Sequence, residues 1–322
     1  MKILANDGLE TAGIQALEQE GFEVITEKVP QESLADFINT ENIRVLLVRS
    51  ATKVRKELID ACPGLKVIGR GGVGMDNIDV DYAISRRIHV VNTPAASSAS
   101  VAELVFAHLF TGARFLQESN RQMPLKGATE FAALKKNYTA GIELRGKTLG
   151  IVGMGRIGQE VAKIALGMGM RVIAADNMVG NASIKVTFYN EQFINVDIDT
   201  EPLEDILQHS DFITFHVPSQ AGGALIGARE IELMKDGVGI INCSRGGIID
   251  EHALVNALDS GKVSFAGLDV FDNEPTPSQE VLNHPKISLT PHTGASTLEA
   301  QERIGLSLAE QVIGILKSDS VN

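Results

Sequence analysis

The feature that most constrains this chain is a glycine-rich turn that lies between a strand pattern and a helix pattern. The turn consists of Gly153, Met154, Gly155, Arg156, Ile157 and Gly158. The apolar run Leu149–Val152 precedes it, and apolar residues at helical spacing follow from Val161 to Ala165. In this context the three glycines allow a tight turn, close approach of the backbone to a pyrophosphate, and close packing of helix on strand. The motif therefore predicts a doubly wound α/β domain that binds a dinucleotide.

A carboxylate at the end of the next strand pattern indicates which dinucleotide binds. Asp176 follows the run Val172–Ala175 and lies 18 residues beyond Gly158 (176 − 158). A carboxylate at about this distance hydrogen-bonds the adenosine ribose, and its charge would repel the 2′-phosphate of NADP. We therefore expect NAD as the cofactor. In a second glycine cluster, Gly69–Gly74, the spacing counted from Gly72 and Gly74 puts Asn77 where the third glycine should stand, so we interpret it as a backbone turn.

Apolar runs alternate with helical patterns along the chain, which predicts two parallel sheets. The first series has strand patterns at residues 3–5, 22–25, 45–48, 65–68 and 88–91. The second series has them at residues 149–152, 172–175, 212–215, 239–242, 265–268 and 287–289. Between the two series we expect one helix from Ser98 to about Glu118 and a polar loop from Lys126 to Asn137. A last helix, from Leu298 to about Leu316, should return to the first domain.

These patterns predict two doubly wound parallel-sheet domains. A Rossmann-type NAD-binding domain (98–291) would be inserted into a discontinuous, flavodoxin-like substrate domain (1–97 and 292–322). The length of 322 residues, 44% of them hydrophobic, is sufficient for two cores. A net charge of −12 disfavours nucleic acid or an anionic membrane as the partner. Two cysteines form no disulfide framework or metal site, and the amino terminus lacks a signal-peptide pattern, so we expect a cytoplasmic protein without a metal.

Three residues that could carry chemistry follow consecutive strand patterns of the second series. Arg245 follows the fourth of these patterns, Glu274 the fifth and His292 the sixth. Ligands of doubly wound sheets bind at the carboxyl ends of the strands. An arginine fork binds a carboxylate through two parallel bonds, and a glutamate beside a histidine orients the ring and stabilises its protonated form. The pattern therefore predicts an anion clamp and an acid–base pair.

Several stretches closely resemble the D-2-hydroxyacid dehydrogenase family, and within it the phosphoglycerate dehydrogenases. They are Gly72–Asp79, Gly153–Gly158, Asn242–Gly247, Gly267–Pro275 and Pro291–Thr297. The resemblance implies that Arg245 holds the substrate carboxylate, that His292 takes the hydroxyl proton as hydride leaves for NAD, and that Glu274 stabilises the imidazolium. It also implies that Asp269 lies near the nicotinamide amide. The further cofactor contacts that it implies are Val101, His216, Val217, Pro218, Cys243 and Ser244.

By the same resemblance, two arginines that follow strands of the first series would bind a substrate phosphate. Two cationic forks, Arg49 and Arg70, suit a phosphorylated acid better than glyoxylate or lactate. The implied substrate contacts are Arg49, Ser50, Arg70, Val73, Gly74, Arg245 and His292. We therefore expect oxidation of 3-phosphoglycerate to 3-phosphohydroxypyruvate, the first step of serine biosynthesis. We also expect a homodimer formed through the helix that begins at Ser98, with Lys135 and Lys136 as further candidates for positive charge.

The chain departs from the family pattern in three places. Ser97 stands where many relatives have an asparagine, which affects the expected substrate preference. The segment Asn177–Thr200 is longer than expected, and its apolar runs predict an added hairpin, either beside the adenine pocket or as a surface elaboration. The regulatory domain that binds serine in many phosphoglycerate dehydrogenases does not follow, so we expect no feedback through it.

Two alternatives to this function stay open. A reductase of glyoxylate or hydroxypyruvate could use the same three catalytic residues without needing Arg49 and Arg70. A dinucleotide-sensing binding protein is the alternative of another class, because similar folds occur in transcriptional corepressors.

Overall fold

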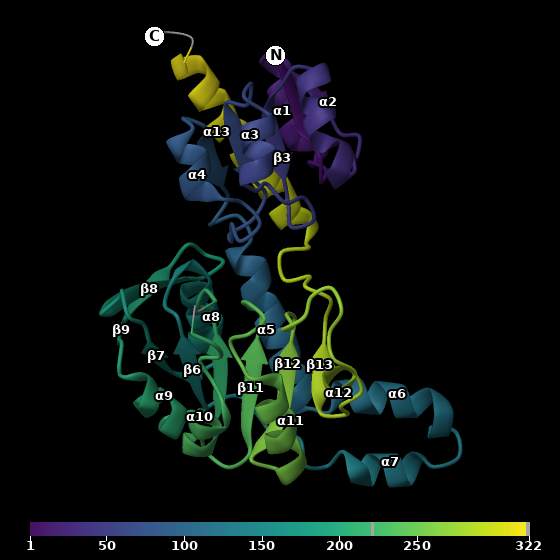
Figure 1. The fold of residues 1–322 in the computed structure, drawn as a ribbon. Helices are drawn as coiled ribbons and strands as arrows, with labels where there is room; N and C mark the ends of the chain where they lie inside the picture. Colours follow the sequence, from purple (N-terminus) through teal and green to yellow (C-terminus); the bar gives the residue numbers. More distant parts are fainter. Residues whose placement is uncertain (220–221, 320–322) are drawn as a thin grey trace. The chain divides into compact units, whose positions relative to one another are not determined.

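The structure is a computed structural model that describes residues 1–219 and 222–319, and the chain forms two compact units. The first unit comprises Met1–Ser98 and Ala295–Asn322, and the second comprises Ala99–Gly294. The first boundary expected from the sequence, 97/98, lies one residue before the observed one. The second, 291/292, lies three residues before it. Each unit contains a parallel sheet, which confirms the α/β class (Figure 1).

The first unit is built on a five-stranded parallel sheet with the strand order β2-β1-β3-β4-β5. Its strands are β1 (Lys2–Ala5), β2 (Glu23–Ile25), β3 (Ile43–Val48), β4 (Val67–Arg70) and β5 (His89–Asn92). This is the flavodoxin-like order, whose winding reverses between β1 and β3. Strand β4 begins two residues later than expected, because the amide of Leu65 closes a turn onto the carbonyl of Cys62.

Helices cover both faces of this sheet, and alternate residues of its strands show which helices lie on which face. Val45 and Leu47 share a core with residues of α1 (Thr11–Gln19) and α13 (Leu298–Asp319). Leu46 and Val48 point to the other core. That core is formed with α2 (Leu34–Thr40), α3 (Lys56–Ala61) and α4 (Val80–Ser85), and a 3-10 turn, η1 (Gln31–Ser33), precedes α2. The last helix of the chain is therefore part of the first unit.

Helices α1 and α13 approach each other closely at a pair of glycines. A Cβ atom added to Gly13 would lie 2.6 Å from the carbonyl oxygen of Gly305. No side chain fits into such a contact unless the backbone of one helix moves. In contrast, a Cβ added to Gly314, further along α13, would meet none of the described atoms within 4 Å.

The substitution Gly13→Ala should lower the free energy of unfolding by about 1–3 kcal/mol, because overpacking forces the two helices apart. The matched substitution Gly314→Ala should raise it by up to about 1 kcal/mol, because alanine favours a helix over glycine. Urea unfolding followed by circular dichroism measures both changes. Stabilisation by both substitutions would contradict the close contact of α1 with α13.

The second unit is built on a six-stranded parallel sheet with the order β13-β12-β11-β10-β6-β7. The strands are β6 (Thr148–Val152), β7 (Arg171–Ala175), β10 (Phe212–Phe215), β11 (Val238–Asn242), β12 (Val263–Leu268) and β13 (Ile287–Leu289). All six strand patterns are confirmed within two residues at each end. The winding reverses between β6 and β10, so the crevice for a ligand is expected at the carboxyl ends of these strands.

Two different sets of helices cover the two faces of the second sheet. Phe212 points toward α5 (Ser98–Ala113) and α8 (Arg156–Gly167), whereas its neighbour Ile213 points into the opposite core. The helices of that opposite core are α9 (Leu203–His209), α10 (Ala228–Leu233), α11 (Glu251–Ser260) and α12 (Gln279–Leu282). The sheet is therefore covered on both sides, and its loops at the carboxyl ends are left to form a site.

The expected hairpin is confirmed as β8 (Asn181–Thr187) paired with the antiparallel strand β9 (Phe193–Asp199). Alternate residues of β8 are buried against α8, including Ile184, which is 1% exposed. Beyond the hairpin, Thr200 forms a single parallel bridge with Ala174. The hairpin therefore packs against α8. On the outer side of β7, the edge strand of the sheet, Thr200 alone of the described residues pairs with it, so no further described strand is added there.

Two expectations about the segment after α5 are wrong. The helix ends at Ala113 instead of continuing to Glu118, because Phe115 adopts a left-handed conformation with φ of 54°. A new helix, α6 (Leu116–Lys126), follows at 56° to α5. The expected polar loop contains α7 (Phe131–Asn137), whose alanines and lysines favour a helix. No described helix can span a membrane by itself, and only the bent pair α5 and α6 passes on combined length and composition.

Candidate active site

The glycine-rich turn connects β6 to α8 at the carboxyl edge of the second sheet. A Cβ atom on Gly153 would lie 2.7 Å from the carbonyl oxygen of His216, and one on Gly158 would lie 2.0 Å from that of Gly153. A Cβ on Gly155 would meet no described atom within 4 Å, so this glycine faces open space. No described side chain caps α8, and its first turn lacks an acidic residue. The turn therefore fits a pyrophosphate, whose charge is stabilised by the helix amides.

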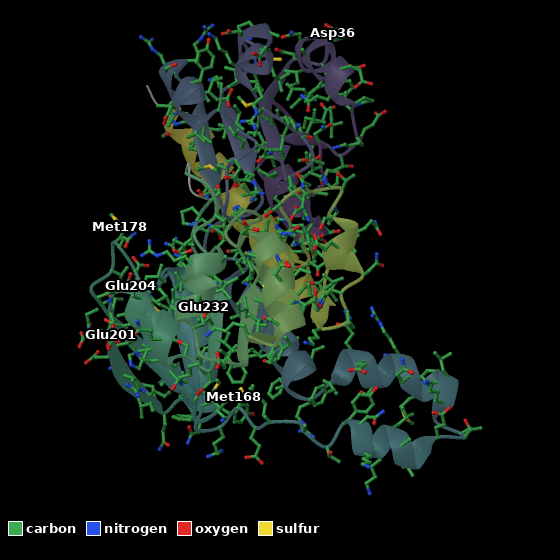
Figure 2. All side chains as sticks on the ribbon, turned by 60° about the horizontal axis from the view of Figure 1, so that its bottom comes forward. Asp36, Met168, Met178, Glu201, Glu204 and Glu232 are labelled. Carbon is green, nitrogen blue, oxygen red and sulfur yellow. The ribbon has the colours of Figure 1, made fainter. Side chains whose placement is uncertain are left out.

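Asp176 follows β7 and is tied to this turn by hydrogen bonds. One carboxylate oxygen accepts a bond of 2.7 Å from the amide of Met154. The other oxygen accepts bonds from the amides of Met178 and Val179, at 2.7 and 3.0 Å. Met178 itself extends away from the unit and is 92% exposed (Figure 2). Because a carboxylate oxygen has two lone pairs and the oxygen bound to Met154 uses one of them here, Asp176 can also accept a hydrogen bond from a ribose hydroxyl of NAD.

The segment after β10 lies directly beside the turn, since His216 carries the carbonyl that limits the space at Gly153. The Nε2 atom of His216 lies 3.0 Å from the hydroxyl of Thr214. Its Nδ1 atom is buried and has no hydrogen-bond partner among the described residues. Burial lowers the pKa of His216 to about 3, so the ring is neutral at physiological pH. The contacts of His216, Val217 and Pro218 with the adenosine stay predictions.

Arg245 lies on the loop after β11, and that loop is held by the side chain of Asn242. Asn242 donates a 2.9 Å hydrogen bond to the carbonyl of Arg245 and accepts one of 2.7 Å from the hydroxyl of Ser244. A Cβ added to Gly246 would lie 1.9 Å from the carbonyl oxygen of Phe271, so glycine is required for this close approach. The loop thus holds the half-buried Arg245 at the carboxyl edge, with Cys243 and Ser244 buried before it.

Glu274 and His292 come together from the loops after β12 and β13. The carboxylate Oε2 atom of Glu274 lies 2.8 Å from Nδ1 of His292, and its Oε1 atom accepts a bond from the amide of Phe271. Asp272, on the same loop as Glu274, accepts a 2.6 Å bond from the amide of Gly247 and so ties this loop to that of Arg245. The structure therefore places the three expected residues on three connected loops and brings Glu274 into contact with His292. Their acid–base role stays a prediction.

Asp269 is buried beneath the loop that carries His292. Its Oδ1 atom accepts bonds from the Thr290 hydroxyl at 2.6 Å and the Thr293 amide at 2.7 Å. Its Oδ2 atom accepts a bond from the Gly294 amide at 2.8 Å. The carboxylate therefore holds the loop on both sides of His292, a role that the sequence did not predict. A second lone pair of Oδ2 is compatible with the expected contact to the nicotinamide amide.

Other residues that the sequence did not single out also build the site. Asn242 is the last residue of β11, Thr290 directly follows β13 and Asp272 lies four residues beyond β12, and this placement was the only available signal. Val101, an expected cofactor contact, is buried on α5, and a Cβ on Gly294 would lie 3.3 Å from its side chain. No group of three or more metal-ligating side chains in the described part of the chain could hold a metal ion.

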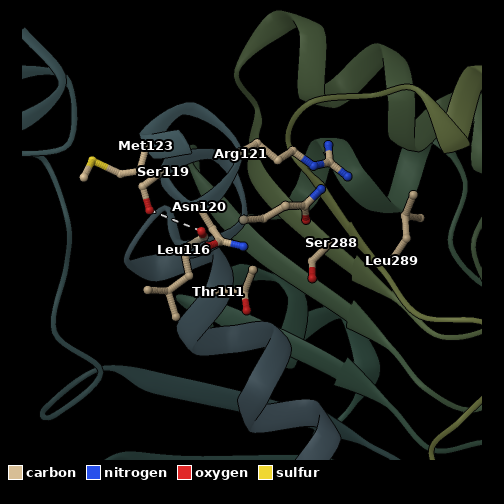
Figure 3. Close-up of a pocket in the computed structure, with 9 residues that line it drawn as sticks. Thr111, Leu116, Ser119, Asn120, Arg121, Met123, Ser288 and Leu289 are labelled. Carbon is tan, nitrogen blue, oxygen red and sulfur yellow. Dashed lines mark hydrogen bonds between the residues drawn. The ribbon is translucent and has the colours of Figure 1, made fainter. Parts of the chain in front are cut away.

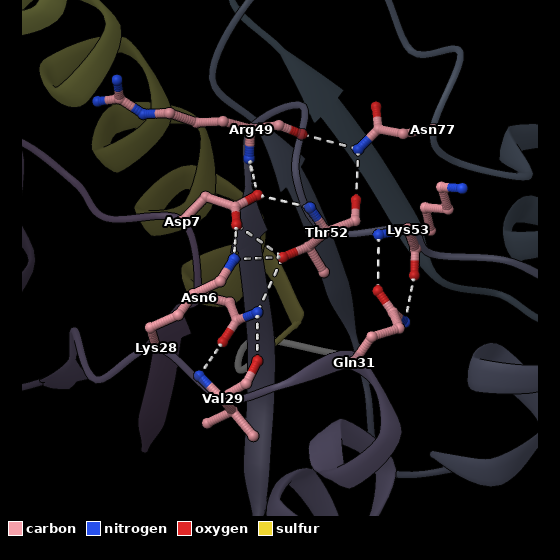
Figure 4. A network of polar contacts seen from close by, with 9 residues as sticks. All are labelled: Asn6, Asp7, Lys28, Val29, Gln31, Arg49, Thr52, Lys53 and Asn77. Carbon is pink, nitrogen blue, oxygen red and sulfur yellow. Dashed lines mark hydrogen bonds and ion pairs between the residues drawn. The ribbon is translucent and has the colours of Figure 1, made fainter. Parts of the chain in front are cut away.

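The first unit has its own cluster of polar residues at the carboxyl edge of its sheet (Figure 4). Asp7, after β1, accepts bonds from the amides of Arg49 and Thr52 at 2.7 and 3.0 Å, and from the Thr52 hydroxyl and Lys28. Burial by itself would raise the pKa of Asp7, but the bonds from Lys28, Arg49 and Thr52 lower it below its ordinary value. The carboxylate thus holds the loop that carries Arg49 in one conformation.

Asn77 joins the loops of the two arginines that were expected to bind a phosphate. Its amide nitrogen donates 2.7 Å bonds to the carbonyls of Arg49 and Thr52. Its carbonyl oxygen lies 3.3 Å from Nε of Arg70, which donates to it. The residue that breaks the second glycine motif therefore has a structural role of its own. Of the other expected contacts, Ser50 and Val73 are exposed and Gly74 is partly exposed.

Three further residues singled out by the sequence lie apart from these clusters. Ser97 is 1% exposed, so it is a buried residue of the first unit. Lys135 and Lys136 are both exposed in the last turn of α7 in the second unit. Their expected role near a substrate stays a prediction.

Comparison with known proteins identifies the family of this chain. A family model, described as the D-isomer specific 2-hydroxyacid dehydrogenase NAD-binding domain, matches residues 106–294. The chain belongs to this family, and it is an NAD-dependent oxidoreductase of the 2-hydroxyacid dehydrogenases. The family membership and the intact acid–base pair favour an enzyme over a protein that only senses the dinucleotide.

Individual relatives differ in the substrates that their names give. A hydroxypyruvate reductase of Thermotoga maritima is 43% identical, and the match covers 97% of each chain. A D-3-phosphoglycerate dehydrogenase of Methanocaldococcus jannaschii is 40% identical over 99% of this chain, but the chain spans only 58% of that protein. The structure of a D-lactate dehydrogenase from Aquifex aeolicus, complexed with NAD and lactic acid, is 28% identical with a TM-score of 0.76, covering 99% of this chain and 96% of that one.

The position of Asp176 predicts a measurable cofactor preference. The ratio of kcat/KM with NADH to that with NADPH should exceed about ten in the parent, because about 1.4 kcal/mol of repulsion gives a tenfold difference. Asp176→Asn removes the charge and should lower this ratio about tenfold. Asp197→Asn removes the same charge from the exposed hairpin and should leave the ratio unchanged. A parent enzyme that uses both cofactors equally would contradict this role of Asp176.

Proposed function

We propose that this protein oxidises 3-phosphoglycerate to 3-phosphohydroxypyruvate with NAD, the entry step of serine biosynthesis. The observation that carries the chemical part is the 2.8 Å contact between Glu274 and Nδ1 of His292. The observation that supports a phosphorylated substrate is the pair Arg49 and Arg70, joined through Asn77 at the carboxyl edge of the first sheet. In this proposal the first unit binds the substrate phosphate and the second unit carries the chemistry.

The proposed mechanism assigns one task to each catalytic residue. Arg245 binds the substrate carboxylate through its guanidinium fork and so orients C2. His292 accepts the hydroxyl proton at Nε2, because its Nδ1 atom is occupied by Glu274. Glu274 stabilises the imidazolium that results. The glycine turn and Asp176 would hold NAD, which would supply the acceptor for the hydride of C2. The alcohol thus loses a proton and a hydride to give the ketone, and the reverse reaction uses His292 as the acid.

A second candidate function is the reduction of hydroxypyruvate or glyoxylate. A specific observation favours it, since the Thermotoga relative named as a hydroxypyruvate reductase matches over 97% of both chains. The same Arg245, Glu274 and His292 would serve this reaction, and Arg49 and Arg70 would then have no phosphate to bind. The two candidates therefore differ in the first unit and share the site of the second.

We also infer that the protein is a cytoplasmic homodimer that associates through the segment from α5 to α7. Support comes from apolar side chains that stand exposed on α6 and α7. They are Leu116, Met123, Leu125 and Phe131, with exposed fractions of 51%, 43%, 77% and 59%. Burial of such side chains against a second copy would be favourable.

The acid–base role of His292 predicts a selective loss of turnover. His292→Ala should lower kcat by about 10²- to 10⁴-fold, because proton transfer by a positioned side chain contributes that much. Binding of NADH, measured by fluorescence titration, should stay within about twofold, since the substitution leaves the glycine turn unchanged. His209→Ala, at an exposed histidine of the same unit, is the matched control. Unchanged turnover in His292→Ala would contradict the proposed acid–base role of His292.

The phosphate role of the arginines predicts a change of substrate preference. Arg49→Ala and Arg70→Ala should each lower kcat/KM for 3-phosphohydroxypyruvate about 10- to 100-fold. This is the effect expected when one hydrogen bond between charged groups is lost. The kcat/KM for hydroxypyruvate should change by less than about threefold, because it carries no phosphate. Arg86→Ala removes an arginine that binds Asp60 on the same unit and serves as the control. A parent that prefers hydroxypyruvate would instead support the second candidate function.

A further inference from the structure

A buried chain of hydrogen bonds runs from α5 to the loop that carries His292. His108, on α5, is 2% exposed. Its Nδ1 atom lies 2.8 Å from the hydroxyl of Ser288, and its Nε2 atom lies 3.1 Å from the hydroxyl of Thr290. The Thr290 hydroxyl in turn lies 2.6 Å from Oδ1 of Asp269. Residues that are 180 positions apart in the sequence thus meet beneath the acid–base pair.

The chemistry of these groups fixes the direction of each hydrogen bond. The carboxylate of Asp269 can only accept, so the Thr290 hydroxyl must donate to it. The oxygen of Thr290 is then free to accept a bond, and the Nε2–H group of His108 is the donor in reach. Burial lowers the pKa of His108, although the charge of Asp269 opposes this shift. The ring is therefore neutral, with its proton on Nε2, and its Nδ1 atom accepts from Ser288.

The chain of bonds acts on the backbone immediately around His292. Thr290 precedes His292 by two residues, while Thr293 and Gly294, whose amides Asp269 also binds, directly follow it. His292 itself has a positive φ of 54°, a left-handed conformation that residues other than glycine adopt uncommonly. Such a conformation persists only where the surrounding contacts hold it. The bond from His108 orients the Thr290 hydroxyl toward Asp269 and so adds to the contacts that hold the loop around His292.

The other end of the chain of bonds reaches a hollow between α6 and the edge of the second sheet. Ser288 lines this hollow together with Thr111 and Arg121, and the hollow has a volume of about 630 Å³ (Figure 3). Of the two bonds of His108, only the one to Thr290 continues to Asp269 and the loop of His292, whereas the bond to Ser288 leads toward the hollow. The bond to Thr290 is therefore the one on which the loop depends.

We propose that His108 is a positioning residue for the dehydrogenase reaction, which acts through Thr290 and Asp269 to hold His292 at the angle required for proton transfer. This inference rests on the proposed role of His292 as the acid–base group. It assigns a catalytic consequence to a helix residue that does not touch substrate or cofactor. The expected consequence is a change in kcat with little change in the binding of NADH or keto acid.

Two variants with the same functional group separate this role from packing. The amide of glutamine reaches the position of Nε2, whereas that of asparagine reaches only the position of Nδ1. His108→Asn should therefore lose the bond to Thr290 and lower kcat about tenfold, since small misplacements of a catalytic group have effects of this order. His108→Gln should keep that bond and retain kcat within about threefold of the parent. Ser288→Ala is the control at the far end and should change kcat by less than about twofold.

The measurements are kcat and KM with the keto acid that the parent reduces fastest, and Kd for NADH by fluorescence titration. In His108→Asn, KM and Kd should stay within about threefold of the parent values while kcat falls. A kcat within twofold of the parent in this variant, or an equal loss in His108→Gln, overturns the proposal. If His108→Asn does not fold, as judged by circular dichroism, Thr290→Val removes the bonds of Thr290 to both His108 and Asp269 and should lower kcat at least about tenfold; a kcat within about twofold of the parent in this variant also overturns the proposal. If His292 is not the acid–base group, His292→Ala stays active whatever the His108 variants do.

Discussion

The buried carboxylate of Asp269 is the interaction on which the rest of the site depends. A charge in the interior is tolerated only where hydrogen bonds replace its lost hydration. Here the hydrogen bonds come from Thr290, Thr293 and Gly294. The same bonds that compensate the buried charge therefore also fix the conformation of the loop. The loop can then present His292 to Glu274 at hydrogen-bond distance. The contact between Glu274 and His292 is therefore held in place by an electrostatic requirement of the interior.

The two units use the same physical rule for different purposes. In each, a parallel sheet is covered by helices on both faces, so polar residues can gather only at the ends of its strands. In the second unit these ends carry the glycine turn, Arg245 and the acid–base pair. In the first unit they carry Asp7, whose carboxylate holds the loop of Arg49, and Asn77, which joins that loop to Arg70. Both clusters are arranged in advance by hydrogen bonds to the backbone.

Much of the fold could be predicted because its signals are local. Apolar runs marked the strands of both sheets, and the glycine turn with Asp176 marked the cofactor site, since the spacing of these residues is set by a single strand–turn–helix unit. The end of α5 was missed because Phe115 adopts a left-handed conformation, which no residue type near it requires. The helix α7 was missed because its charged residues resemble those of a loop.

The sequence by itself determined the class of the protein, its cofactor and the three residues proposed to carry the chemistry, because each of these lies in a short motif directly after a strand. Only the tertiary structure decided what supports them. The bonds of Asp269 to residues 290–294 span more than 20 positions, and those of His108 to β13 and its loop span about 180. Such partners are set by the order of strands in the sheet and by which helix covers each face. Neither property can be read from the neighbours of a residue in the sequence, because packing brings distant segments together.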